Sequence, residues 1–396
     1  MSLIGLVMGE TVLELDELLR FAVENDASDL HVKVGSPPFL RVDGRLEPAP
    51  FDTVTAADTE RIASAIVPEE LDRAHEADFA HSVAGLGRFR VSMFRQRGSV
   101  GLVLRRVTPG IPALEELGLP PVAQDFAESP NGLVLVVGPA RSGKTTTLAA
   151  MVDHVNASQR KHIVTIEDPI EILHRDQQSI VNQREVGTDT ETYATAVRRA
   201  MRHDPDVILI GALGDAETAR AALAAASAGQ LVLASMATLT SSATVQALVE
   251  YFPAHLEHHA RTMLAMSLRG IVSQRLLSRS DGSGRALAAE VLVATPPVID
   301  AVSHGDEMQA FPMVIAEGEY WGMQSLDESL LALFEQGWVA KRDVIANAHD
   351  PSDIRIALER IGAGPVGGAP FGADDGTESP PLLSERRTAD QAGQAG

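Results

Sequence analysis

The sequence predicts an α/β protein with a parallel-sheet core, a smaller α+β domain before that core, and helices after it. From residue 131 onward, apolar strand-like runs alternate with helical patterns, which is typical of a parallel sheet covered by helices. The stretch GPARSGKTTT, residues 138–147, stands between such a run and a helix. The length of 396 residues exceeds one ordinary core and predicts two domains or slightly more.

Charge and composition limit the partners. The chain has 33 basic and 54 acidic side chains and a net charge of −21. Because such a surface repels nucleic acid and anionic lipid unless a local basic patch overrides it, we expect no nucleic-acid partner. Cysteine is absent, which excludes disulfides and thiolate metal sites. The first 19 residues lack a basic region and a long apolar run, so we expect no signal peptide and a cytoplasmic location.

Residues 1–107 predict the smaller α+β domain. Its patterns are a helix over 12–26, a strand within 27–35, and strand–turn–strand signatures over 37–48 and 87–107. Asp43-Gly44 and Arg97-Gly98 supply the turns of these two hairpins. The proline-rich segment 108–121 is the predicted linker to the next domain.

Residues 122–362 predict the core domain. Strands are expected over 132–138, 162–168, 206–211 and 231–236, and helices over 143–156, 191–203 and 215–229. Residues 254–362 look mainly helical, and the Gly/Pro/Ala-rich tail over 363–396 is predicted to be disordered. Residues 221–249 carry no charge, so a membrane span is an alternative on length alone. The break at 228–230 favours a helix followed by a buried strand instead.

A phosphate-binding loop matches the pattern Gly-x-x-x-x-Gly-Lys-Thr, with a strand before it and a helix after it. Glycines let backbone N–H groups wrap the phosphates, the lysine reaches the β and γ oxygens, and the threonine hydroxyl binds Mg²⁺. We therefore expect ATP and Mg²⁺ as cofactors. The predicted binding residues are Gly138, Pro139, Ala140, Arg141, Ser142, Gly143, Lys144, Thr145 and Thr146.

Hydrolysis needs acids as well. Glu167, Asp168 and Glu171 follow the second core strand, at the edge where a parallel sheet binds its ligand, so they are candidates for the metal or the attacking water. The alternative is a solvated loop. The third core strand ends in Gly211-Ala212, and the next carboxylate is Asp215.

These stretches resemble the PilT-type motor ATPases of type IV pili, within the secretion-ATPase superfamily. The resemblance covers nearly the whole chain. ASDLHVKVGSPPFLRVDGRL and GRFRVSMFRQRG are similar to the N-terminal domain of that family, TIEDPIEILH to its aspartate box, and VNQREVG to the segment that follows. AMSLRGIVSQRLL and GMQSLDESLLALFEQG resemble its C-terminal helices. The resemblance implies a RecA-like core with a PAS-like N-terminal domain, a hexameric ring, and a pilus platform protein of the inner membrane as partner.

The resemblance also assigns roles to positions. The family glutamate thought to act on the attacking water falls on Glu171, and Glu171 and the phosphate-binding Lys144 are the predicted catalytic residues. Arginines of the N-terminal domain reach the nucleotide of a neighbouring subunit in that family, and Arg88, Arg90 and Arg95 are the candidates here. Their alternative is a solvent-facing strand.

Several positions depart from the family pattern. Arg141 replaces a glycine of the phosphate loop, where it either strains the loop or adds a phosphate contact, and Asp300 replaces an arginine of the retraction motif. Four further family residues are replaced. Ala212 stands for the Walker B glutamate, Gly214 for the arginine two residues later, and Gln230 and Ala237 for two histidines of the histidine box. We expect these four positions to lie in one pocket. His255, His258 and His259 are spaced for a metal site on a helix, but an exposed helix face is the better interpretation.

Three functional hypotheses follow. The first is a PilT-like subunit that binds ATP and Mg²⁺ in a ring with weak or absent turnover, because an alanine cannot replace the Walker B carboxylate. The second is an active retraction motor that uses Glu171 and a compensating acid, either Asp215 or Glu167. The third is an ATP-binding adaptor of a paralogous motor, in a homo-hexamer or a mixed ring at the inner face of the membrane.

Overall fold

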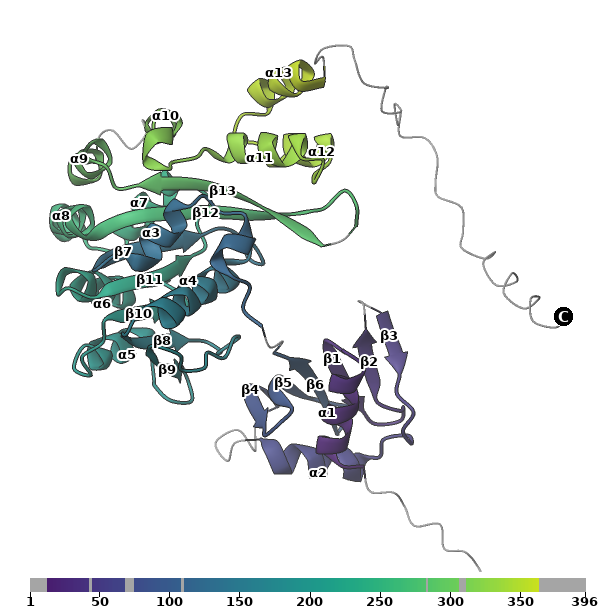
Figure 1. Cartoon of the computed structure of the whole chain (residues 1–396). Coiled ribbons are helices and arrows are strands. Elements are labelled where there is room, and N and C mark those ends of the chain that lie inside the picture. Colours follow the sequence, from purple (N-terminus) through teal and green to yellow (C-terminus); the bar gives the residue numbers. More distant parts are fainter. Residues whose placement is uncertain are drawn as a thin grey trace, which may run out of the picture.

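The structure is a computed structural model that places two sheets in separate parts of the molecule (Figure 1). The described residues are 13–42, 45–67, 75–107, 110–282, 284–305 and 311–362. The predicted tail over 363–396 and the Asp43-Gly44 turn lie outside them.

The N-terminal sheet has the strand order β3-β2-β1-β6-β5-β4, and its neighbouring strands pair antiparallel. Side chains from alternate strand positions and from two helices share one core that includes Leu19 and Val91. Arg97 and Gly98 have φ of 50° and 81° between β5 and β6, as the predicted hairpin requires. The elements are α1 (Leu15–Glu24), β1 (Asp29–Lys33), β2 (Phe39–Val42), β3 (Arg45–Pro48), α2 (Ala56–Ile66), β4 (Glu76–Val83), β5 (Gly87–Gln96) and β6 (Ser99–Arg106).

The second sheet has the order β13-β12-β7-β11-β10-β8-β9. Its pairs are parallel except β12 with β13, so β7, β11, β10 and β8 end at the same edge. This edge carries the phosphate loop, which follows β7. The strands are β7 (Gly132–Val137), β8 (His162–Glu167), β9 (Ile180–Glu185), β10 (Val207–Ile210), β11 (Leu231–Met236), β12 (Leu268–Ser278) and β13 (Arg285–Val293).

Helices cover both faces of this sheet (Figure 1). One face packs on η2 (Leu114–Leu117), α3 (Val122–Glu128) and α4 (Lys144–Ser158). The other packs on α5 (Tyr193–Ala200), α6 (Ala216–Ser227), α7 (Ser241–Glu250), α8 (Glu257–Ser267), α9 (Pro296–His304) and α10 (Phe311–Ala316). Further short helices are η3 (Ala254–Leu256) and η5 (Glu319–Trp321). A separate cluster joins α11 (Leu326–Glu335), α12 (Lys341–Asn347) and α13 (Pro351–Gly362) to β12 and β13.

The prediction of a mainly helical region over 254–362 is wrong for β12 and β13, and the strand β9 was missed. AMSLRGIVSQRLL was expected in a mainly helical region, but most of it forms β12, which pairs with β7 and β13. A Cβ at Gly270 would lie 2.0 Å from the Phe126 ring, so β12 packs directly against α3. Buried on both faces, β12 lacks the alternation that distinguishes a strand from a helix. The edge strand β9 was not predicted at all, because Asn182, Gln183 and Arg184 interrupt its apolar pattern.

The uncharged segment 221–249 folds as the favoured interpretation predicts. It contains the end of α6, the buried strand β11 and most of α7, and Gly229 between α6 and β11 has φ of 109°. None of the helices in the described ranges is long and apolar enough to cross a membrane.

Candidate functional site

The phosphate loop joins β7 to α4 through backbone conformations that favour glycine. Gly138, Arg141 and Gly143 have φ of 148°, 66° and 90°. A Cβ at Gly138 would lie 2.3 Å from the Gln274 carbonyl oxygen, so no larger residue fits there. Arg141 is the non-glycine residue of this set, and its left-handed conformation costs about 1 kcal/mol or more. The family glycine at this position thus has a conformational reason.

Lys144 lies inside the loop. Its Nζ donates to the carbonyl oxygens of Gly138 and Pro139, both at 2.8 Å. Burial lowers the pKa of the Lys144 ammonium below its ordinary value. Gly143 precedes the first residue of α4, and the amino end of this helix favours an anionic ligand. The loop therefore has the donors and the cation that a polyphosphate needs.

β12 supports this loop from behind. The fully buried Gln274 donates from Nε2 to the Ser142 carbonyl oxygen at 2.8 Å. The Ser142 Oγ and Gln274 Oε1 atoms are buried without a hydrogen-bond partner. The next residue, Arg275, donates from Nη1 to the Asn347 carbonyl oxygen of α12 at 2.8 Å. β12 thus touches the phosphate loop and the C-terminal helices with consecutive residues.

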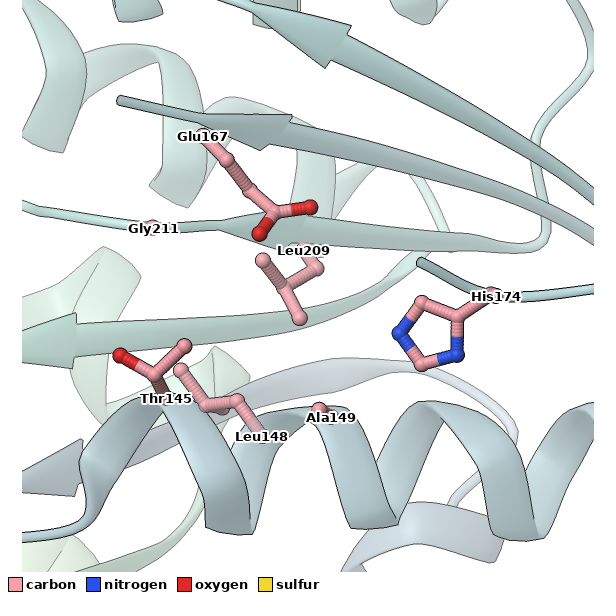
Figure 2. Close-up of a pocket in the computed structure, with 7 residues that line it drawn as sticks. All are labelled: Thr145, Leu148, Ala149, Glu167, His174, Leu209 and Gly211. Atoms are coloured by element: carbon pink, nitrogen blue, oxygen red, sulfur yellow. The ribbon is translucent and has the colours of Figure 1, made fainter. Parts of the chain in front are cut away.

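A small cavity lies between α4 and the ends of β8 and β10 (Figure 2). Its volume of about 20 Å³ admits one water-sized molecule. Figure 2 shows the Glu167 carboxylate pointing from the end of β8 toward α4, which carries Thr145. The lining residues are Thr145, Leu148, Ala149, Glu167, His174, Leu209 and Gly211. The cavity thus places one acid of the predicted metal set beside the threonine that is predicted to bind Mg²⁺.

Glu167 is buried and held in place. Its Oε1 accepts from Thr165 Oγ1 at 2.7 Å and from Gln183 Nε2 at 3.1 Å. Burial raises the pKa of the Glu167 carboxyl, and these two hydrogen bonds oppose that rise. On the other side of the cavity, burial lowers the pKa of His174, whose Nδ1 atom has no hydrogen-bond partner. Burial also raises the pKa of Tyr193, near Asp168 and Glu167.

The other two predicted acids lie outside the cavity lining. Asp168 is exposed directly after β8. The Glu171 carboxylate is half exposed and lies 3.8 Å from Arg90 Nη1. Among the described residues, no group of three or more His, Cys, Asp or Glu side chains could hold a metal ion. A Mg²⁺ ion here would depend on the Thr145 hydroxyl, Glu167 and the phosphates.

The Walker B position has no acid. Ala212 follows β10 and is exposed, as is Gly214. The next acid, Asp215, is the N-cap of α6: Oδ1 accepts from the backbone N–H groups of Glu217 and Thr218, both at 2.9 Å, and Oδ2 accepts from Thr218 Oγ1 at 2.7 Å. Asp215 therefore has a structural task that occupies its carboxylate.

The expectation that four replaced positions share one pocket is wrong for Gln230. Leu231 pairs with Gly132 and Met236 pairs with Val137, so β11 runs from the far edge of the sheet toward the phosphate loop. Gln230 precedes β11 and lies at the far edge, whereas Ala237 follows it at the loop edge. The error arose because the histidine box spans a whole strand, whose two ends lie at opposite edges.

The three arginine candidates have partners within the same chain. Arg88 Nη2 lies 2.6 Å from Glu185 Oε2, Arg90 lies near Glu171, and Arg95 Nη1 lies 3.0 Å from Glu60 Oε1. Each of the three side chains therefore lies beside an acid of its own chain.

The remaining candidates lie on exposed helix surfaces. His255, His258 and His259 are exposed on η3 and the start of α8. Asp300 is 70% exposed on α9 and pairs with His304 at 3.3 Å.

Sequence reasoning missed several residues around the loop and the acids. They are Gln274, His174, Gln183, Glu185 and Tyr193. His174 ends the TIEDPIEILH stretch, and Gln183 and Glu185 belong to VNQREVG, so those two motifs contained the signal. Gln274 was hidden by the helical interpretation of β12.

Comparison with known proteins gives the family. A family profile described as Type II/IV secretion system protein matches residues 10–309. The chain belongs to this family. PilU, a type IV pilus ATPase of Pseudomonas aeruginosa, is 38% identical over 351 residues, which cover 88% of this chain and 92% of PilU. PilT, a type IV pilus retraction ATPase of the same bacterium, is 37% identical over 346 residues, which cover 86% and 100%.

Two solved structures have a similar fold. The crystal structure of the pilus retraction motor PilT with bound ADP matches at a TM-score of 0.81 and 38% identity, covering 87% of this chain and 99% of that one. The ATPase DotB of Legionella pneumophila matches at 0.69 and 25% identity, covering 84% and 95%. The predicted resemblance to PilT-type motors is confirmed, and so is the predicted α/β core with an N-terminal domain and C-terminal helices.

Proposed function

We propose that this chain binds ATP with Mg²⁺ at the phosphate loop and acts as a ring-forming subunit of a type IV pilus motor, with weak or absent hydrolysis. One contrast carries the proposal: the binding loop is complete, whereas β10 is followed by the exposed Ala212. Lys144 lies among the loop carbonyls, and Thr145 and Glu167 line the same cavity, which supports the proposal of a Mg²⁺-bound triphosphate at this loop. Bound ADP in the similar PilT structure supports a nucleotide in this loop.

The weak turnover follows from electrostatics. A carboxylate after β10 would act on charge that develops as the γ-phosphate is transferred, and loss of one such group costs on the order of 10² or more in rate. Asp215 does not replace it, because three hydrogen bonds commit its carboxylate to α6. We propose that the subunit assembles into a hexameric ring at the cytoplasmic face of the inner membrane, where the ring contacts a pilus platform protein. The similarity to PilT and PilU supports this placement.

A second candidate is an active motor that uses Glu171 with Glu167 as the compensating acid. The observation that favours it is the cavity that Glu167 shares with Thr145. A third candidate, an adaptor within a mixed ring, shares the binding chemistry of the first and differs in its ring partner.

The test measures ATP affinity and Mg·ATP turnover in the full chain. The Ala212→Glu and Ala212→Gln variants are compared, since glutamine has the length of glutamate without its charge. We expect nucleotide binding with little turnover in the unchanged protein, a rise of about 10²-fold or more in Ala212→Glu, and none in Ala212→Gln. Lys144→Ala is the control that should abolish binding.

Two outcomes decide between the candidates. Fast turnover in the unchanged protein that disappears in Lys144→Ala and Glu167→Gln would favour the active motor. Absence of ATP binding would refute the proposal entirely. Native mass spectrometry with and without a co-expressed paralogous motor separates a homo-hexamer from a mixed ring.

A further inference from the structure

The ion pair between Arg88 and Glu185 joins the N-terminal sheet to the core sheet. Arg88 is the second residue of β5, whereas Glu185 ends β9, and their side chains are 17% and 5% exposed. The Nη2 to Oε2 distance of 2.6 Å is that of a charge-assisted hydrogen bond. Because both groups are largely removed from water, loss of one charge leaves the other buried without compensation.

Glu185 connects this ion pair to the acidic segment. Its Oε2 atom, which accepts from Arg88, also accepts from the backbone N–H of Ile170 at 3.0 Å. Its Oε1 atom accepts from Thr188 Oγ1 at 3.2 Å. Ile170 is buried and directly precedes Glu171. One carboxylate therefore holds both the N-terminal sheet and the backbone that carries the candidate water-activating glutamate.

A second arginine of the same strand lies over Glu171 itself. Arg90 Nη1 is 3.8 Å from Glu171 Oε1, and both side chains are about half exposed. This outer pair is weak in water, since exposed ion pairs contribute little. The buried Arg88 pair supplies the anchoring, and it brings Arg90 to Glu171 because the two arginines are on the same strand.

We propose that Arg88 and Glu185 form an intrachain latch, which fixes the N-terminal domain against residues 168–171 and positions Glu171 beneath Arg90. Arg88 and Glu185 are positioning residues in this proposal. With the latch closed, Arg88 is paired with Glu185 of its own chain. Arg88 can therefore reach the nucleotide of a neighbouring copy only after the latch opens. The latch itself does not depend on nucleotide; only the water-activating role of Glu171 rests on a candidate of the proposed function.

The absence of cysteine makes the latch directly measurable. Ser64→Cys on α2 and Ser158→Cys at the end of α4 replace exposed serines, one in each domain, and accept spin labels as a unique pair. Electron–electron distance measurements on the full chain without nucleotide then report the domain arrangement. Hydrogen exchange of the Ile170 amide reports the acidic segment independently.

The variants are Arg88→Gln, Glu185→Gln and the double variant. Glu185→Gln keeps an acceptor for Ile170 and is the milder change if Arg88→Gln fails to fold. The control is Arg106→Gln: Arg106 is 14% exposed, close to the value for Arg88, and pairs at 3.0 Å within the N-terminal domain with Asp26, which is 93% exposed.

We expect both single variants to broaden the distance distribution and to speed Ile170 exchange about tenfold or more, the scale of a hydrogen bond to a charged group. The double variant should be no worse than either single variant, and Arg106→Gln should change neither readout. An unchanged distribution in Arg88→Gln, an equal change in Arg106→Gln, or additive effects in the double variant would each overturn the latch.

Discussion

Substitutions of Asp215 can distinguish a structural role of this acid from a catalytic role. Its carboxylate accepts two backbone N–H groups and one hydroxyl at the start of α6. Asp215→Ala removes all three bonds and should lower the free energy of unfolding by about 1–2 kcal/mol, the usual value of an N-cap. Asp215→Asn keeps the two backbone N–H bonds, since asparagine caps as well as aspartate, but its Nδ2 atom cannot accept from the Thr218 hydroxyl, and the interaction of the charge with the helix dipole, about 0.3–1 kcal/mol, is lost.

The pH dependence has a definite sign. Burial alone would raise the pKa of Asp215, but hydrogen bonds from Thr218 and Glu217 outweigh burial and lower it. A lowered pKa means that the stabilisation is complete above the unfolded-state pKa and is lost as the pH falls through the folded-state pKa. The difference between the unchanged protein and Asp215→Ala should therefore be largest near neutral pH and shrink in acid.

The assay combines thermal unfolding with ATP turnover on the same preparations. At about 2–4 °C per kcal/mol for a domain of this size, Asp215→Ala should melt about 2–8 °C below the unchanged protein. Asp215→Asn should lie between the two and keep the ATP turnover of the unchanged protein. A folded Asp215→Asn protein that loses tenfold or more of measurable turnover would refute the structural assignment and restore Asp215 as the compensating acid.

Three further predictions concern the phosphate loop and its cavity. Gln274→Leu leaves the Ser142 carbonyl without its donor and should weaken binding of a fluorescent ATP analogue about tenfold; unchanged affinity would contradict the support from β12. Arg141→Gly removes the steric cost of a side chain in the left-handed conformation and should raise the unfolding free energy by about 1 kcal/mol in urea titrations, whereas a loss would show that the Arg141 side chain stabilises the loop. Burial raises the pKa of Glu167, so its contribution to stability falls as the pH rises through the folded-state pKa. Glu167→Gln should thus be at least as stable as the unchanged protein at pH 7 and lose that advantage in acid, a trend that chemical unfolding at several pH values checks.

The parts of the fold that could be predicted are those whose signals are local. β7, α4, β8, β10, α6 and β11 are continuous apolar or amphipathic runs with glycine or polar boundaries, and the phosphate loop depends on its own residues. The Arg97-Gly98 turn was predictable for the same reason.

The remaining parts depend on contacts distant in the sequence. β12 is a strand because β7 and β13 pair with it, and Gly270 is required because Phe126, far earlier in the chain, packs there. The position of Gln230 at the far edge follows from strand direction, which a motif match does not encode. The partner of Arg88 was equally hidden, because Glu185 is on an edge strand of the other domain.

The register of β12 has a consequence for how the family can change by insertion and deletion. Gln274 reaches the phosphate loop and Arg275 reaches α12, because successive strand residues point to opposite faces. An insertion of one residue directly before Gln274 would place the inserted residue under the loop and would turn Gln274 toward α12. Natural length variation in this hairpin should therefore be confined to its tip around Gly282, beyond both contacts, and the intervening strand should keep its length even where its residues diverge.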